Sequence, residues 1–94
     1  MEAGRVPQIS WSEHLDAQGR PHWSRHLEAN RIERTAAREA IERDLLTRIT
    51  GRQLERGPNQ IALVIQGWQV LYGAYLFADG SVNVGRAIVL ELAE

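Results

Sequence analysis

Three histidines near the N-terminus are the side chains in this sequence that are best suited to chemistry. His14, His22 and His26 lie close together, and Glu13 adjoins the first of them. Imidazoles beside a carboxylate are typical of a metal site or of a general acid–base pair. In a simple hairpin register Glu13 faces His22 across the strands. We therefore take His14, His22 and Glu13 as the catalytic candidates.

The spacing of these residues argues against both kinds of site. Neither an HExxH nor an HxH pattern occurs, and the chain has no cysteine to supply a thiolate ligand. No obvious nucleophile, such as the serine of a nucleophile elbow, accompanies an acid and a base, and no GxGxxG or GxxxxGK[ST] loop is present. We favour three exposed histidines on a polar hairpin face. The sequence predicts no metal, no cofactor and no catalysis of its own.

An aromatic and basic cluster overlaps the histidines. Trp11 and Trp23 flank Arg20, His22 and Arg25. Exposed rings among cations are suited to stacking on nucleic-acid bases, whereas buried rings supply much of the apolar area of a small core. Burial is the favoured interpretation. A nucleic-acid-binding module that uses Arg20, His22, Trp23 and Arg25 is kept as an alternative.

Composition narrows the class of protein further. The net charge of −1 creates no overall field that attracts nucleic acid, and a hydrophobic fraction of 44% is ordinary for a globular domain. All 11 basic residues are arginine, and because they are spread along the chain we favour a coding bias over selection for bidentate contacts. Proline, asparagine, glutamine and glycine interrupt the uncharged stretch 57–78, so it is not a membrane span. With no signal-peptide pattern, we expect a cytoplasmic protein.

The first element expected is a β-hairpin over about residues 6–29. Ile9, Trp11 and Leu15 occupy alternate positions, and Asp16 to Gly19 suits a type I turn with a left-handed glycine. Residues 22–27 form the return strand in this interpretation. A helix over residues 24–29 is the alternative, since it leads directly into the next element.

A long helix is expected over about residues 30–50. Asn30 is a good N-cap, and Glu33 completes a capping-box pattern. Ile41 and Leu45 lie at the centre of an apolar stripe that recurs every four residues. Gly51 is suited to the position just after the helix. We expect Ile41 and Leu45 to be buried against a sheet.

Antiparallel strands are expected over about residues 60–92. Asp79-Gly80 is a strong signal for a two-residue hairpin loop between strands 70–77 and 82–92. That loop fixes the register. Facing pairs on one side of the hairpin are then Phe77 with Val82, Tyr75 with Val84, Gly73 with Arg86, and Leu71 with Ile88.

These elements predict a single α+β domain over residues 1–94, with one long helix packed on an antiparallel sheet in the order ββαβββ. Apolar side chains occupy both faces of the expected strands, but the helix covers only one face. The other face is the expected partner-binding surface, unless Trp11 and Trp23 of the hairpin cover it. Its residues are Leu71, Tyr75, Phe77, Val84 and Ile88.

The function expected from this surface is that of a small non-catalytic interaction protein. It binds further copies of itself, as a dimer or larger assembly, or another protein. The short length and the arginine-only basic set suggest a bacterial or phage origin. The alternatives are the nucleic-acid module, and a small enzyme or ligand-binding protein whose site forms between subunits. No membrane partner is expected.

Overall fold

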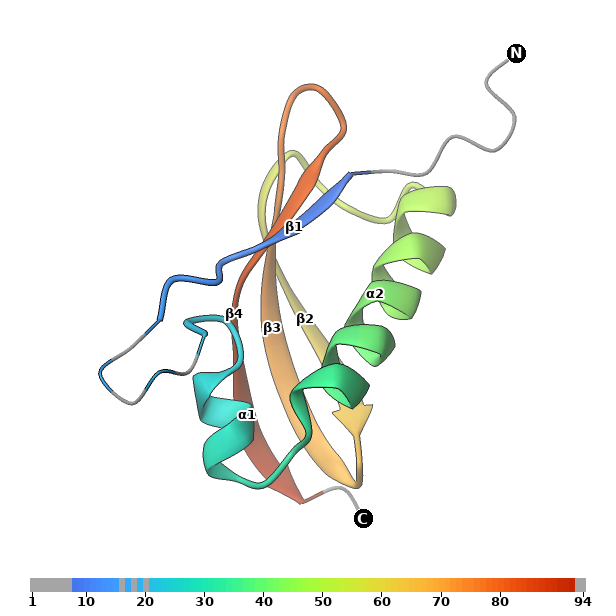
Figure 1. Ribbon diagram of the computed structural model, residues 1–94. Coiled ribbons are helices and arrows are strands. Elements are labelled where there is room, and N and C mark those ends of the chain that lie inside the picture. Colours follow the sequence, from blue (N-terminus) through green and yellow to red (C-terminus); the bar gives the residue numbers. More distant parts are fainter. Residues whose placement is uncertain (1–7, 16, 18, 20, 93–94) are drawn as a thin grey trace.

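A mixed sheet with helices on one face forms the fold. The computed structural model describes residues 8–15, 17, 19 and 21–92. The sheet order is β1-β4-β3-β2, with β1 parallel to β4 and the other neighbours antiparallel (Figure 1). The α+β class is confirmed, but the order is βααβββ. The elements are β1 (Ile9–Trp11), α1 (Arg25–Ala29), α2 (Arg34–Thr50), β2 (Gly57–Ile65), β3 (Trp68–Leu76) and β4 (Val82–Leu92).

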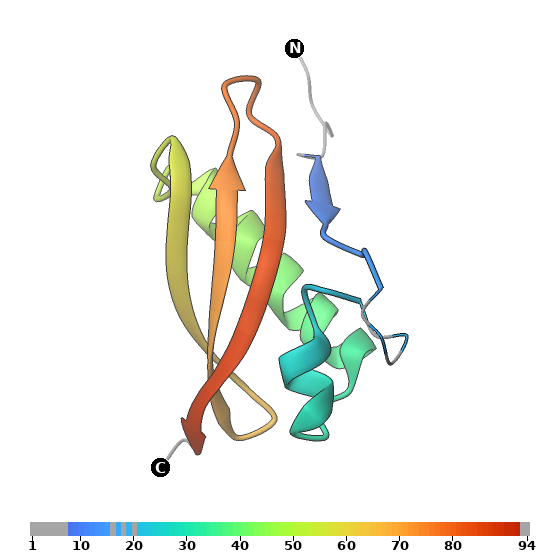
Figure 2. The ribbon, with the colours of Figure 1, turned by 90° about the vertical axis from the view of Figure 1, so that its left-hand side faces the viewer.

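The N-terminal segment does not form the predicted hairpin. Leu15 and Pro21 pair as an isolated bridge, while β1 lies beside β4 (Figure 2). The predicted return strand over residues 22–27 is wrong, since Arg25–Ala29 is helix α1, as in the alternative. The predicted turn at Asp16 to Gly19 includes positions outside the described residues.

The backbone partners of this segment explain the difference. Ser12 N donates to Val84 O at 2.9 Å, and Ala87 N donates to Trp23 O at 2.9 Å. Strand β4 therefore satisfies two main-chain groups of this segment, while the N–H groups of His22 and Trp23 donate locally to His14 O and Ser12 O. A three-residue strand at this edge suffices, because the following residues fold into α1.

Helix α2 begins later than the capping pattern predicts. Asn30 is the C-cap of α1, and its side-chain amide donates to His26 O at 3.0 Å. Arg31 has a φ of 64°, which breaks the helix. Glu33 is the N-cap of α2 without a capping bond from its side chain, and its N–H donates to Gln66 Oε1 at 3.1 Å. The predicted N-cap at Asn30 is therefore wrong.

Burial of Ile32 accounts for the interruption. Its side chain is 1% exposed, and its N–H donates to Leu27 O at 3.0 Å. One continuous helix from residue 25 to residue 50 would be straight, whereas a sharp turn lets α1 and α2 both lie on the sheet (Figure 1). The apolar area that Ile32 buries offsets the strain of the left-handed residue before it.

The core lies between the helices and one face of the sheet. Ala37, Ile41 and Leu45 of α2 are each 0% exposed, so the predicted stripe is confirmed. Trp23 and Leu27 extend the same core beneath α1. The strand residues that complete it are Ile61, Ile65, Val70, Tyr72, Ala74, Val82, Val84 and Ala87.

The turn between β3 and β4 is longer than predicted. Phe77 N donates to Ser81 O at 2.9 Å, so residues 77–81 form the turn instead of Asp79-Gly80 alone. Asp79 Oδ1 accepts bonds from the Ser81 hydroxyl at 2.6 Å and the Ser81 N–H at 2.9 Å, and these bonds lower the pKa of the Asp79 carboxyl. Asp79 thus organises a wide turn, which moves the register by one residue.

A β-bulge then restores the predicted register. Leu76 pairs with Val82 and Ala74 with Val84, whereas Gly73 already pairs with Arg86. Gly85 is the extra residue between them. The predicted pairing was therefore wrong before Gly85 and correct from Gly73–Arg86 to Val70–Val89, after which a second register shift pairs Gln69 with Glu91.

The shift reverses the faces of the first residues of β4, because neighbouring positions point to opposite sides of a sheet. Val82 and Val84 were expected on the unpartnered face. Both are 0% exposed and lie in the core with the helices.

Candidate interaction surface

The sheet face opposite the helices carries apolar side chains that no described segment covers. In Figure 2 the strands β2, β3 and β4 lie in front of α2, while α1 and β1 lie beside β4. The described residues of the N-terminal segment do not cover this side, since Trp11 and Trp23 pack into the core on the helix side. We call this side the open face. Its apolar residues are Ala62, Val64, Leu71, Tyr75, Phe77, Ile88 and Leu90.

The exposure of these side chains is high for their type. Val64 is 57% exposed, Tyr75 45%, Phe77 44% and Leu90 50%. The Tyr75 and Phe77 rings lie against each other, with centroids 4.8 Å apart. They form a raised apolar ridge at one end of the face, of the kind that marks an interaction site on a soluble protein.

A hollow adjoins the ridge. Its volume is about 120 Å³, and it lies over Gly73 and Gly85, with Pro58, Tyr75 and Asn83 around it. The glycines create it because neither has a side chain to fill the space above the strands. The open face thus offers a protrusion and a depression side by side.

The charged groups of this face are few and opposite in sign. Arg86 and Glu91 are exposed and pair with Gly73 and Gln69 of β3. One cation and one anion leave the face close to neutral. It therefore offers little to select a strongly charged partner such as a nucleic acid.

The sequence located most of this surface but not all of it. Leu71, Tyr75, Phe77 and Ile88 lie on the open face as expected. Val84, expected with them, is a correction, because the register shift before Gly85 turns it into the core.

Sequence reasoning missed the contribution of β2, namely Ala62 and Val64. The sequence of β2 does not indicate which residues are exposed, since every residue from Ile61 to Ile65 is apolar. The structure shows the difference. Exposed and covered positions alternate along Gly57–Ile65, with Ile61 and Ile65 buried and Ala62 and Val64 exposed. Period-two alternation marks a strand with one covered face.

The aromatic and basic cluster is largely structural. Trp23 is 0% exposed and packs on Trp11 with ring centroids 4.6 Å apart. The guanidinium of Arg38 lies over the Trp11 ring at 4.9 Å and pairs with Glu13 at 3.2 Å. These contacts fasten the N-terminal segment to α2. The Trp23 ring is not available to stack on a base, and Arg20 lies outside the described residues.

Two polar atoms in this cluster, Trp23 Nε1 and Arg25 Nε, are buried without a hydrogen-bond partner among the residues that the structure describes. A buried donor left unpaired costs about 1–3 kcal/mol. The apolar area of the Trp23 ring must offset that cost. This is consistent with a core role for Trp23.

The catalytic candidates do not assemble as predicted. His22 N donates to His14 O at 2.8 Å, so the backbone brings these residues together. Glu13, however, pairs with Arg38 of α2. Within residues 8–15, 17, 19 and 21–92 no three histidine, aspartate or glutamate side chains gather closely enough to hold a metal ion.

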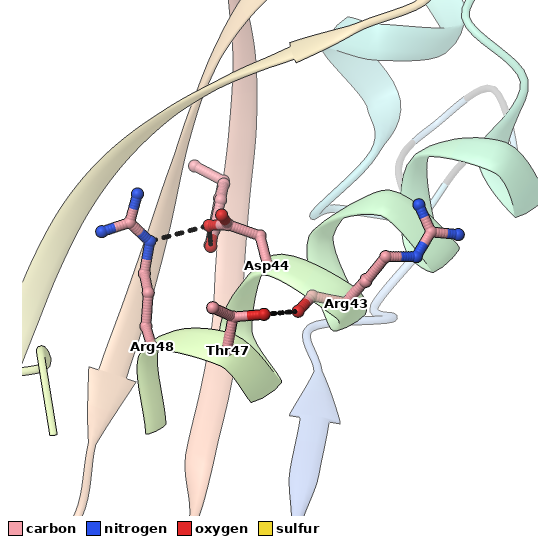
Figure 3. Close-up of polar contacts among 5 residues, drawn as sticks. Arg43, Asp44, Thr47 and Arg48 are labelled. Carbon is pink, nitrogen blue, oxygen red and sulfur yellow. Dashed lines mark hydrogen bonds and ion pairs between the residues drawn. The ribbon is translucent and has the colours of Figure 1, made fainter. Parts of the chain in front are cut away.

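A polar network joins α2 to the sheet. Asp44 accepts a bond from Arg48 Nε at 2.8 Å, as Figure 3 shows, and a second from the Tyr72 hydroxyl at 2.5 Å. Burial, followed by the bond to Asp44, raises the pKa of Tyr72. The bond to Asp44 also raises the pKa of Arg48. A neutral tyrosine donor and a carboxylate held by a cation form a structural clamp.

Comparison with protein-family models, with curated proteins and with solved structures finds no match to this chain. Among the described helices, none has the length and apolar character that crossing a membrane requires. The function is therefore inferred from the geometry of the chain itself.

Proposed function

We propose that this chain is a non-catalytic interaction protein whose open face binds a second copy of the chain. One observation carries the proposal. The same three long strands have a helix-side face whose central residues are fully buried and an opposite face on which Val64, Tyr75 and Phe77 are about half exposed. Large contiguous apolar surface is unfavourable in water, and covering it stabilises an assembly.

Shape and charge favour a second copy over an unrelated partner. In a two-fold arrangement each surface meets its own image, so a protrusion needs a matching depression on the same face. The Tyr75–Phe77 ridge and the neighbouring hollow of about 120 Å³ supply both. Arg86 and Glu91 are likewise available to pair across the axis.

The size of the face indicates how strong this association is. Three strands of about nine residues cover roughly 30 Å by 15 Å at ordinary strand spacings, or about 450 Å² in projection. Two apposed faces then cover about 900 Å², somewhat below the ~1,200–2,000 Å² of stable specific interfaces. The face alone supports an association that depends on protein concentration.

The test is to charge the ridge and measure mass in solution. Tyr75→Glu places a carboxylate within the proposed interface while changing a side chain that the fold leaves 45% exposed. Light scattering over a range of concentrations is expected to show a smaller particle than the wild type. Unchanged circular dichroism shows that the fold is kept.

Leu15→Glu is the matched control, since Leu15 is 58% exposed but lies outside the sheet. This variant is expected to keep the wild-type mass. A wild-type chain that stays monomeric at high concentration, or a Tyr75→Glu variant with unchanged mass, contradicts the proposal.

A further inference from the structure

The two edges of the sheet differ sharply. β1 closes one edge with three residues, and a strand so short offers little backbone for another chain to pair with. β2 forms the other edge with nine residues, Gly57–Ile65, and has β3 as its neighbour on one side only. None of these nine residues is charged. Proteins usually protect an exposed edge with charges or bulges, and β2 has neither.

The register shows which backbone groups of β2 face outward. Gln66 and Gly67, with φ of 51° and 81°, form a two-residue loop between Ile65 and Trp68, which pair directly. Residues that flank such a loop exchange both backbone hydrogen bonds, and bonded and unbonded positions then alternate. The N–H and C=O groups of Gln60, Ala62 and Val64 therefore point away from β3.

Pro58 alternates with Gln60, Ala62 and Val64 in the same way, so the side on which proline lacks an N–H faces outward, away from β3. That is the position at which an edge strand tolerates proline without losing a bond to its neighbour. Gln60, Ala62 and Val64 are left as an uninterrupted row of outward donors and acceptors. The row is symmetric about Ala62.

We infer that β2 is a second self-association site, at which the β2 strands of two copies pair antiparallel about Ala62. In this register Ala62 meets Ala62 of the other copy, and Gln60 meets Val64. Two facing residues are then both even-numbered or both odd-numbered. Even-numbered residues of β2 lie on the open face and odd-numbered ones on the helix side, so each residue meets one on its own side of the sheet. No like charges meet, because the strand has none.

A hollow beside this edge supports the same arrangement. It has a volume of about 260 Å³ and opens between α2 and β2, lined by Ala40, Arg43, Thr47 and Leu63 among others. A strand added to the edge would narrow this opening and cover Leu63.

The edge and the open face generate different symmetry axes. Edge pairing needs a two-fold axis perpendicular to the sheet, whereas stacked open faces need one parallel to it. Two perpendicular two-fold axes that intersect produce a closed D2 tetramer, so the proposed open-face axis passes beneath Ala62, and the short β1 edge prevents growth of the sheet. The tetramer requires both the edge contact and the open-face contact of the proposed function. The edge contact by itself does not depend on the proposed function.

Proline at Ala62 tests the edge. Ala62→Pro removes an outward N–H that the monomer does not use, and Leu15→Glu is again the control, because Leu15 lies outside both proposed interfaces. Light scattering is expected to show a wild-type tetramer. Ala62→Pro should lower the mass about two-fold, while Leu15→Glu leaves it unchanged. Ala62→Pro with native circular dichroism and the wild-type mass overturns the inference.

Tyr75→Glu separates the two interfaces. It should also give about half the wild-type mass, and combining it with Ala62→Pro should give a monomer. If Tyr75→Glu keeps the wild-type mass while Ala62→Pro halves it, the proposed function fails and the edge contact stands. If Tyr75→Glu lowers the mass and Ala62→Pro does not, the edge contact fails alone.

Amide hydrogen exchange in the wild type tests the edge without any substitution. A monomer protects the amides of Ile61 and Leu63, which bond to β3, but exposes those of Gln60, Ala62 and Val64. Edge pairing protects both sets. Protection of both sets that is lost on dilution supports the inference, and alternating protection at every concentration overturns it.

Discussion

The two faces of the sheet are made from the same strands but are completed in different ways. On the helix side, Ile41 and Leu45 meet Val70 and Tyr72, and all four are 0% exposed. On the open side, side chains of similar size remain about half exposed. Among the described residues the chain has one long helix, α2, and this helix covers one face of the sheet. A small protein that builds two apolar faces with covering elements for only one is suited to association.

The N-terminal segment sharpens this contrast. Its two large rings, Trp11 and Trp23, do not cover the open face. They pack against each other in the core on the helix side. The pairing of β1 with β4 commits the segment to that side. Four predictions follow from the difference between the faces, and they are ordered by expected effect.

Deleting Gly85 should have the largest effect. Without the bulge residue β4 pairs in one continuous register, which turns either Val82 and Val84 or the following residues to the wrong face. Exposing two buried valines costs about 3–6 kcal/mol, at roughly 1.5–3 kcal/mol each. Urea denaturation measures the loss.

Gly85→Ala is the control for this deletion. An added Cβ would lie 3.9 Å from Asn83 Nδ2 and 4.0 Å from Ser12 Oγ, which is ordinary contact. Its cost should stay below about 1 kcal/mol. A deletion variant as stable as Gly85→Ala would show that the bulge does not assign the faces.

Leu45→Ala should cost about 2–5 kcal/mol, because it leaves a cavity where α2 meets the sheet. Thermal and urea unfolding measure the change. Val64→Ala on the open face is the comparison and should cost less than about 1 kcal/mol, since Val64 is already 57% exposed. Equal costs would contradict the assignment of the faces.

Tyr72→Phe should cost on the order of 1 kcal/mol at neutral pH, because it removes the hydrogen bond to Asp44 while keeping the ring. Burial raises the pKa of Tyr72 in the folded state. The unfolded tyrosine ionises above about pH 10, so the wild type loses stability as the pH rises beyond that value.

The phenylalanine variant lacks this particular loss. Urea midpoints measured between neutral and alkaline pH should therefore converge for the two proteins. A gap that stays constant above pH 10 would show that Tyr72 is not held neutral by the fold.

Val64→Thr should have the smallest effect, within about 0.5 kcal/mol for the free chain at low concentration. The isosteric change Val84→Thr should cost about 1–3 kcal/mol, since it places a hydroxyl in the core where Val84 is 0% exposed. Denaturation of both variants at one dilute concentration compares the faces with a single chemical change. Similar costs would contradict their different environments.

Local patterns predicted the parts of the fold that depend on neighbouring residues. The apolar stripe of α2 and the strands after Gly57 follow from periodicity, because side-chain direction repeats every 3.6 residues in a helix and every two in a strand. The pairs Gly73 with Arg86 and Leu71 with Ile88 were predicted as well. The unpartnered face followed from counting the elements available to cover it.

Tertiary contacts decided the rest. Asn30 and Glu33 match a capping box, yet burying Ile32 turns the chain between them and α2. Residues 22–27 were predicted to be a strand, yet the chain becomes helix α1 at Arg25, and Trp23 O accepts a bond from Ala87 N of β4.

The sequence by itself determined that this chain forms an α+β domain with more apolar surface than one helix can cover. Which valines belong to that surface was settled only in three dimensions. Asp79 bonds to Ser81 and widens the turn, and Gly85 then absorbs the extra residue as a bulge. The wide turn and the bulge each shift the register of the two strands by one residue. Because neighbouring residues of a strand point to opposite faces, a shift of one residue moves a side chain from the surface to the core or back. The sequence periodicity indicates that the sheet has two faces, but the pairing with the neighbouring strand decides which residue lies on which face.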